Sequence, residues 1–284
     1  MSEKSWTPLE LLRWTTDYFR DHGIPSPRLD AELLLAHAMG LKRIDLYLGF
    51  ERPVAAAERA RFRTLMKRRA EQRVPVAYLT GVREFWSLPF HVTPDVLIPR
   101  PETETLVRVI ADLGPGSIAE VGTGSGCVSA AIAAELPGAR ILATDSSPEA
   151  LDVARQNLEG QGLGQRVELR HSDCLADIRE TFEAVVSNPP YVPSSELVEL
   201  APEVRHEPSL ALDGGPDGLD IVRQLIEQAP ERLVRPGWLA LEVGSGQARR
   251  VERLCQERGA ARVDIHKDLA GIERVVAAHF PAGV

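Results

Sequence analysis

The stretch Ile118-Ala119-Glu120-Val121-Gly122-Thr123-Gly124-Ser125-Gly126 decides which fold this chain of 284 residues adopts. Its first four residues are typical of the buried end of a strand, and the apolar run from Cys127 to Leu136 is typical of a helix. A glycine-rich turn between a strand and a helix lets the backbone approach a ligand closely. Cys127 stands where the dinucleotide pattern G-x-G-x-x-G needs its third glycine. The stretch therefore predicts a site for a cofactor without a pyrophosphate.

Two acidic residues follow the next two strands. Asp145 ends the strand expected at 139–144, at the position from which a carboxylate can accept both ribose hydroxyls of an adenosine. Asp173 follows the strand expected at 166–171, where it either accepts from an adenine amine or caps a helix. We therefore predict that the cofactor is bound by seven residues of these segments, namely Gly122, Thr123, Gly124, Ser125, Gly126, Asp145 and Asp173.

Alternating strands and helices fill the chain beyond residue 100, which predicts an α/β fold with a parallel sheet covered on both faces. Helices are expected in most gaps between the first five strands. The last two strands are too close for a crossover helix, so we expect an antiparallel hairpin there. This pattern resembles the methyltransferase variant of the doubly wound, Rossmann-like fold. The expected strands are 117–121, 139–144, 166–171, 183–187, 237–243, 261–267 and 273–280.

The first part of the chain has a different pattern, typical of a small helical domain over residues 1–73. Thr7-Pro8-Leu9-Glu10 is a capping box that opens the first helix. Further helices are expected from Ser26 to Gly40, near 44–48 and over 54–72. Prolines and short β-rich pieces, 77–79 and 84–92, predict a β-hairpin linker over 74–100. The remaining residues, 101–284, form the α/β domain.

Charge is unevenly distributed between these parts. Residues 1–73 carry 14 Lys and Arg against 10 Asp and Glu, whereas the rest carries 19 against 31. The acidic larger part disfavours a broad groove that grips a nucleic-acid backbone. Seven cations fall within residues 59–73, which indicates either a solvated helix face or a docking surface for an acidic partner.

The spacing of the cysteines and the lack of long apolar runs argue against a disulfide-rich, metal-binding, membrane-spanning or secreted protein. Cys127, Cys174 and Cys255 are widely separated, so we expect three reduced, buried thiols and neither a disulfide nor a metal site. No apolar run has the length of a membrane span, and residues 1–7 lack the apolar stretch of a signal peptide. The expectation is a cytoplasmic protein.

Asn188-Pro189-Pro190-Tyr191 follows the strand expected at 183–187, at the edge of the sheet where ligands bind. An amide or aromatic amine nitrogen is a poor nucleophile because its lone pair is delocalised. Two acceptors that hold both N–H bonds can aim this lone pair at a methyl group, and the Asn188 side-chain oxygen and the Pro189 carbonyl are suited to that task. Consecutive prolines stiffen the loop, and Tyr191 offers a stacking face. We predict methyl transfer with Asn188, Pro189 and Tyr191 as catalytic residues.

Over nearly its full length the sequence resembles the peptide chain release factor N5-glutamine methyltransferases. The Asn-Pro-Pro-Tyr tetrad alone is shared with DNA adenine methyltransferases, so other motifs make the resemblance specific. They are Arg83-Glu84-Phe85-Trp86, Ile98-Pro99-Arg100-Pro101-Glu102-Thr103-Glu104, the stretch from Glu120 to Gly126, Tyr191-Val192-Pro193, and the stretch from Glu207 to Leu219.

The resemblance implies that the cofactor is S-adenosyl-L-methionine and that Asn188 contacts both cofactor and substrate. It implies that Arg100 and Glu102 lie near the amino-acid end of the cofactor. The implied partner is a class I peptide chain release factor, modified on the glutamine of its Gly-Gly-Gln loop. Cys174 stands where relatives often carry an aromatic residue, which removes a stacking partner for adenine. The implied substrate-binding residues are Phe85, Asn188, Pro189, Pro190 and Tyr191.

Other functions share parts of this pattern. An adenine N6-methyltransferase has the same cofactor and tetrad but needs a basic target-reading domain, which the acidic α/β part does not supply. A glutamine methyltransferase that acts on a ribosomal protein is separated poorly by sequence. An adenosine-binding regulatory module does not need the Asn188 loop, and a nicotinamide-dependent dehydrogenase needs a different glycine loop.

Overall fold

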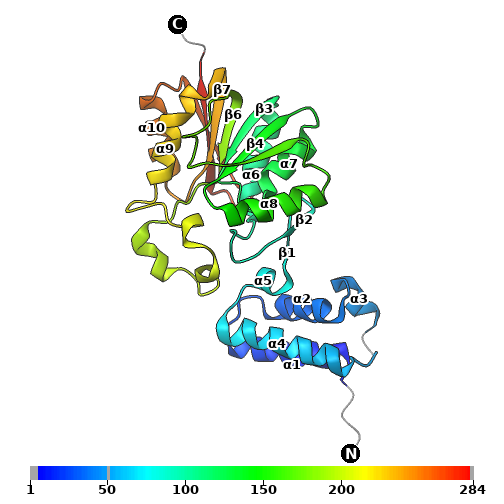
Figure 1. Cartoon of the computed structure of the whole chain (residues 1–284). Coiled ribbons are helices and arrows are strands. Elements are labelled where there is room, and N and C mark those ends of the chain that lie inside the picture. The colour runs from blue at the N-terminus through cyan, green and yellow to red at the C-terminus, as the bar shows by residue number, and fades with distance from the viewer. Residues whose placement is uncertain (1–5, 50–51, 282–284) are drawn as a thin grey trace, which may run out of the picture. The chain divides into compact units, whose positions relative to one another are not determined.

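The computed structural model describes residues 6–49 and 52–281, and it separates the chain into two compact units. The first unit contains the chain up to Gly81 together with Ala201–His206, and the second contains Val82–Leu200 and the chain from Glu207 onward. Figure 1 shows the first unit as a group of helices and the second as a sheet with helices on both faces. These units differ from the expected division at residues 73 and 100, because the hairpin belongs to the second unit.

The first unit is helical, as the sequence predicted. Its helices are α1 (Pro8–Asp21), α2 (Pro27–Met39), α3 (Arg43–Leu48), α4 (Ala56–Gln72) and α5 (Val76–Thr80). The capping box forms, since Thr7 accepts from the Glu10 amide at 3.3 Å and Glu10 accepts from the Thr7 amide at 3.0 Å. Gly40 ends α2 with a φ of 65°, a left-handed cap that glycine adopts without strain.

The core of this unit contains a buried ion pair beside its apolar side chains. Phe19, Leu34 and Phe62 are among its buried apolar residues. Arg69 is only 5% exposed, and its guanidinium binds Asp30 and Glu203, each at 2.8 Å. Removing one partner of such a pair leaves an uncompensated buried charge, so Arg69 is a structural residue.

One expected strand is a helix. Ala77–Leu79 was expected in the β-hairpin, but it lies within α5, where the Leu79 amide donates to the Pro75 carbonyl at 3.1 Å. The expectation is wrong because Leu79 is buried in the helical core, and this packing outweighs local β propensity. The hairpin itself is confirmed, with β1 (Val82–Phe85) and β2 (Leu88–His91) paired antiparallel.

The seven-stranded sheet of the second unit agrees with the sequence prediction. Its strands are β3 (Ser117–Val121), β4 (Arg140–Asp145), β5 (Val167–His171), β6 (Phe182–Ser187), β7 (Leu233–Glu242), β8 (Arg262–Lys267) and β9 (Glu273–Phe280). Their order is β5-β4-β3-β6-β7-β9-β8. The first five are parallel, and β9 is antiparallel to both β7 and β8, which confirms the predicted hairpin.

Helices cover both faces of this sheet. One apolar cluster joins the sheet to α6 (Glu104–Leu113), α7 (Cys127–Glu135) and α8 (Pro148–Gly160), and the other joins it to α9 (Asp220–Gln228) and α10 (Ala248–Glu257). Neighbouring strand residues such as Ile118 and Ala119 fall in opposite clusters, as the period of two along a strand requires. Among the described residues, no helix is long and apolar enough to cross a membrane.

Residues 6–49 and 52–281 also contain five short 3-10 helices: η1 (Pro101–Thr103), η2 (Ser194–Glu199), η3 (Val204–His206), η4 (Ser209–Ala211) and η5 (Ala229–Glu231). Three of them, η2, η3 and η4, lie in the long connection between β6 and α9. All three cysteines are free and buried, as expected, and burial raises the pKa of each thiol to about 12.

Candidate active site

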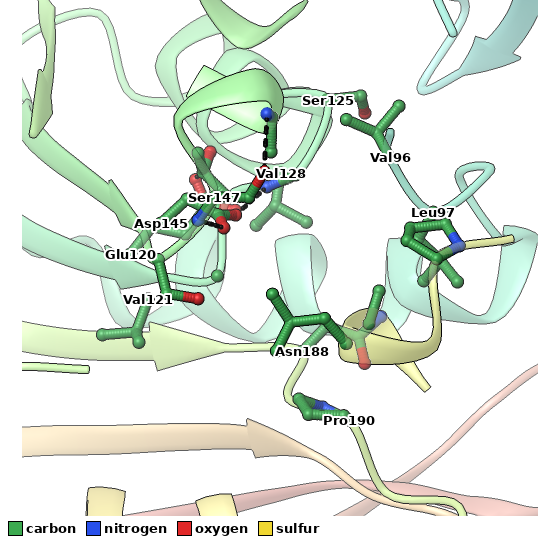
Figure 2. Close-up of a pocket in the computed structure, with 18 of the residues that line it drawn as sticks. Val96, Leu97, Glu120, Val121, Ser125, Val128, Asp145, Ser147, Asn188 and Pro190 are labelled. Carbon is green, nitrogen blue, oxygen red and sulfur yellow. Dashed lines mark hydrogen bonds between the residues drawn. The ribbon is translucent and has the colours of Figure 1, made fainter. Parts of the chain in front are cut away.

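A pocket opens where the parallel strands of the second unit end. Figure 2 shows residues from the ends of β3, β4 and β6 gathered around it. The turns after these strands carry the glycine loop, the Ser146–Ser147 turn and Asn188. Of the residues predicted to form the site, the pocket is lined by Gly122, Thr123, Gly124, Ser125, Asp145, Asp173, Asn188 and Pro190.

The glycine loop presents bare backbone to this pocket. Gly122 and Gly124 have φ values of 72° and 54°, which glycine adopts readily. A Cβ added at either position would meet no atom within 4 Å, so space is left beside the backbone. Gly126 differs, because an added Cβ would lie 3.3 Å from the Ala154 Cβ of α8. Gly126 therefore allows two helices to pack closely, while the other two glycines border the pocket.

Asp145 is held at the pocket by backbone amides. Its Oδ2 accepts from the Gly124 amide at 2.8 Å, and its Oδ1 accepts from the Ser147 amide at 3.0 Å. Burial raises the pKa of this carboxyl, and the amides of Ser147, Gly124 and Ser146 act against that rise. A carboxylate beside open glycine backbone fits the ribose of an adenosine-containing cofactor.

Glu120 also lines the pocket, although no separate role was predicted for it. It is 2% exposed and accepts a hydrogen bond from the Thr123 hydroxyl at 2.8 Å, and the Ser129 hydroxyl also donates to it. Burial raises its pKa to about 7, and both hydroxyl groups act to lower it. The sequence feature that could have indicated a role for Glu120 was an acidic residue inside an otherwise apolar strand.

Asp173 lies at the pocket without a helix after it. Residues 174–177 form a turn, so the alternative that Asp173 caps a helix is wrong. Its side chain is exposed, and its Oδ1 lies 3.4 Å from the Gln224 Nε2. Cys174 lines the same pocket but is only 6% exposed. The carboxylate of Asp173 is therefore accessible to a ligand.

The Asn188 loop divides into residues that line the pocket and residues that support them. Asn188 and Pro190 line the pocket, whereas Pro189 is buried and Tyr191 packs near Gly244, outside the lining. Phe85, a predicted substrate residue, is 2% exposed and meets Phe90 edge-on at 6.3 Å in the core. Phe85 thus belongs to the apolar layer under the hairpin and does not line this pocket.

A glycine-rich segment holds the end of the Asn188 loop. Gly214 donates from its amide to the Val192 carbonyl at 2.9 Å, and Val192 donates to Leu212 at 2.9 Å. A Cβ on Gly214 would lie 2.7 Å from the Pro190 carbonyl oxygen, and a Cβ on Gly218 would lie 2.3 Å from the Tyr191 carbonyl oxygen. These distances leave no room for a side chain, so this segment must be glycine to approach the loop.

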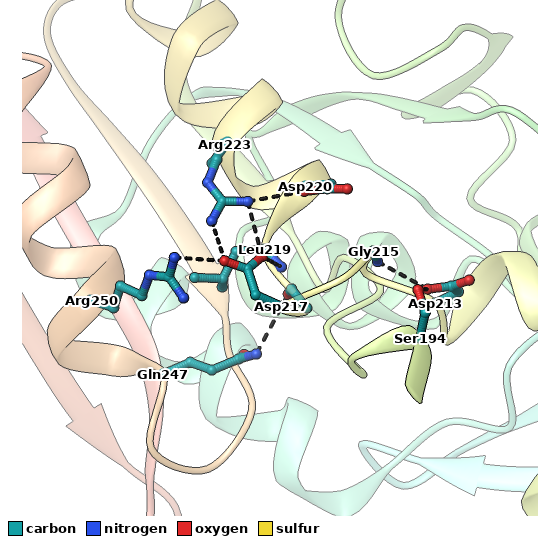
Figure 3. A network of polar contacts seen from close by, with 10 residues as sticks. Ser194, Asp213, Gly215, Asp217, Leu219, Asp220, Arg223, Gln247 and Arg250 are labelled. Carbon is teal, nitrogen blue, oxygen red and sulfur yellow. Dashed lines mark hydrogen bonds and ion pairs between the residues drawn. The ribbon is translucent and has the colours of Figure 1, made fainter. Parts of the chain in front are cut away.

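The second glycine-rich turn, Glu242–Gln247, supports the same loop. Figure 3 shows Gln247 and Arg250 reaching toward the segment from Asp213 to Asp220. The Gln247 amide donates to the Tyr191 carbonyl at 3.0 Å and accepts from the Gly244 amide at 2.8 Å. Asp217 pairs with Arg223 and, at 2.6 Å, with Arg250. This turn follows the end of β7 at Glu242, and it buttresses the site.

Two motifs that carry the family resemblance, 98–104 and 207–219, meet beside the pocket. Glu207 is 6% exposed, accepts from the Ile98 amide at 3.1 Å and pairs with Arg100 at 2.6 Å. Arg100 lines the pocket, whereas Glu102 does not. In the part of the chain that the structure describes, no group of three or more His, Cys, Asp or Glu side chains could hold a metal ion.

Comparison with known proteins finds matches for both the helical part and the α/β part of the chain. Residues 10–81 match the PrmC N-terminal domain, and residues 101–204 match the methyltransferase small domain. A methyltransferase from Pyrococcus furiosus is 20% identical with a TM-score of 0.54, over 69% of this chain and 90% of its own. The N-terminal domain of human METTL16, solved with SAH, is 17% identical with a TM-score of 0.51. This likeness covers 79% of this chain and 83% of the METTL16 chain. The fold and the pocket define an S-adenosylmethionine-dependent methyltransferase.

Relatives across the full length identify the family. The release factor glutamine methyltransferase of Rhodopirellula baltica is 43% identical and covers 97% of both chains. That of Geobacter sulfurreducens is 41% identical, over 97% of this chain and 98% of its own. The chain belongs to the release factor glutamine methyltransferase family.

Proposed function

We propose that the protein transfers a methyl group from S-adenosylmethionine to the side-chain amide nitrogen of the glutamine in the Gly-Gly-Gln motif of class I release factors. The observation that carries this proposal is that Asn188 and Pro190 line the same pocket as the open glycine loop and Asp145. The names of full-length relatives point to the same substrate.

The residues of the pocket have distinct tasks in this proposal. The glycine loop and Asp145 hold the adenosine part of the cofactor, and Asp173 accepts from the adenine amine. The Asn188 side-chain oxygen and the Pro189 carbonyl accept the two N–H bonds of the glutamine amide, so that its lone pair faces the methyl group. The cofactor supplies an electrophilic methyl group. Rigid placement of two reactants lowers the barrier by up to about 7–11 kcal/mol.

Mass spectrometry of a purified release factor tests this proposal directly. The factor is incubated with the enzyme and S-adenosylmethionine, and intact and tandem spectra are recorded. One added methyl group on the Gly-Gly-Gln glutamine is expected. Duplex DNA and ribosomal proteins in parallel reactions test the alternatives, and methylation of either one without methylation of the release factor would overturn the proposed substrate.

Replacing Asp145 with alanine is expected to weaken the affinity for S-adenosylmethionine by roughly 10- to 100-fold, the usual effect of losing hydrogen bonds to a charged group. Isothermal titration calorimetry measures this affinity. Asp152→Ala is the matched control, because Asp152 lies on the outer face of α8 with its side chain 76% exposed. Equal affinities for the wild type and Asp145→Ala would exclude the ribose role.

The exposed cations of α4 are proposed to dock an acidic surface of the release factor. Of the seven cations within residues 59–73, Arg69 and Arg73 pair with Glu203 inside the helical unit, and Arg59 donates to the Val54 carbonyl. The remaining four are exposed along the helix, where they favour encounter with an acidic partner: Arg61, Arg63, Lys67 and Arg68.

Reversing the charge of Arg63 and Lys67 together is expected to raise KM for the intact release factor by about tenfold, since charged rims mainly change association. KM for a short Gly-Gly-Gln peptide should stay the same, because a short peptide lacks the acidic surface that these cations are proposed to dock. Steady-state kinetics with both substrates and at two salt concentrations measure the effect. Arg13→Glu with Lys42→Glu is the control, with two exposed cations of the same unit reversed elsewhere.

A further inference from the structure

The orientation of the Asn188 amide depends on a residue outside the Asn-Pro-Pro-Tyr loop. Asn188 Nδ2 donates to the Thr103 Oγ1 at 3.1 Å. Thr103 is 2% exposed, ends η1 directly before α6, and lines the pocket. Among the described residues, the Asn188 side chain forms no hydrogen bond other than this one.

An asparagine amide has an oxygen end and a nitrogen end of nearly the same shape, so its neighbours decide which end faces which way. A threonine hydroxyl can donate its one hydrogen or accept through its lone pairs. If it donates to Asn188, the amide oxygen turns toward Thr103 and away from a substrate. If it accepts from Asn188, the amide oxygen is left for the substrate N–H bond.

Glu242 favours the second of these two arrangements. Its carboxyl lies at the end of β7 and is 1% exposed, and burial raises its pKa to about 7, while a hydrogen bond from the Thr103 side chain acts to lower it. When the carboxyl is ionised it only accepts, so the Thr103 hydrogen is then directed toward Glu242 and the Thr103 lone pairs are left for Asn188 Nδ2, in agreement with the 3.1 Å hydrogen bond between Asn188 and Thr103. Glu242 Oε2 is buried without a hydrogen-bond partner among the described residues, so the carboxyl keeps further accepting capacity.

We propose that the Thr103 hydroxyl is a positioning group that turns the Asn188 amide so that its oxygen faces the substrate nitrogen. This inference rests on the proposed methyl transfer to a glutamine amide, where Asn188 must accept from an N–H bond. Thr103 acts through Asn188, and its hydroxyl takes no part in bond making.

Three variants separate this role from a general effect on packing. Thr103→Val keeps the shape and removes the hydroxyl, and kcat for release-factor methylation is expected to fall by about tenfold or more, as the loss of one buried hydrogen bond allows. Thr103→Ser keeps the hydroxyl and should retain kcat within about threefold, since only a methyl group is lost. Asn188→Ala provides the background in which Thr103→Val should cause no further loss.

A double-mutant cycle in kcat is therefore the decisive measurement. Non-additive losses with rescue by serine support the proposal, whereas additive losses or an equally impaired serine variant overturn it. The wild-type protein is assayed first. If it does not methylate the release factor, the proposed function fails, and the role of Thr103 is then judged from the NMR measurement alone. The side-chain amide signal of Asn188 in a nitrogen-15 NMR spectrum provides a test independent of activity. It should shift in Thr103→Val and stay in place in Thr103→Ser, and an unmoved signal in the valine variant overturns the proposal.

Discussion

Replacing Asn188 with alanine is expected to lower kcat by roughly 10²–10³-fold, the size of effect seen when one preorganised hydrogen-bonding group is removed from a transition state. The amide nitrogen of glutamine has a delocalised lone pair, and we propose that this side chain is one of two acceptors that aim it. Single-turnover methylation of a purified release factor measures the effect, because the chemical step is then separated from product release.

The fold should survive this substitution, since Asn188 is partly exposed at a loop. Thermal unfolding of the variant is expected to stay within a few degrees of the wild type, and cofactor affinity serves as a second control. A variant with near-normal turnover would show that the assignment of Asn188 is wrong. A variant with a strongly lowered Tm would instead point to a structural role.

Replacing Gly218 with alanine is expected to reduce kcat by about 100-fold, because small displacements of a catalytic loop have effects of that size. The added Cβ would lie 2.3 Å from the Tyr191 carbonyl oxygen and 2.7 Å from Gln247 Nε2. Neither the loop nor the glycine-rich segment can give way alone, since Gly214 and Val192 join them by hydrogen bonds. Tyr191, and with it Asn188, must therefore move.

Gly246→Ala is the matched control for this substitution. Both glycines have left-handed backbones, with φ values of 74° and 82°, so both alanine variants bear a strain of roughly 1–2 kcal/mol. A Cβ on Gly246 meets no atom within 4 Å. The control should lose a little thermal stability and retain its kcat. Equal activity losses in the two variants would show that strain, and not contact with the loop, is responsible.

Much of this architecture follows from patterns a few residues long. The strands at 117–121 and 273–280 agree with the expected ranges, because buried strands and amphipathic helices have different hydrophobic periods. The capping box at Thr7 also depends only on residues that are close together in the sequence. Local patterns fail where distant packing decides, as at Ala77–Leu79, which is helical because Leu79 fills a space between helices.

The same distinction applies to the site. The sequence by itself determined that the glycine loop, Asp145 and Asn188 end neighbouring strands, because the carboxyl ends of parallel strands share one edge of the sheet. Only the tertiary structure decided that β9 lies between β7 and β8, and that Phe85 is buried away from the pocket. It also decided that Gly218 touches the Asn188 loop and that Thr103 meets Asn188. These contacts join residues far apart in the chain, and their geometry depends on how all the packed layers fit together.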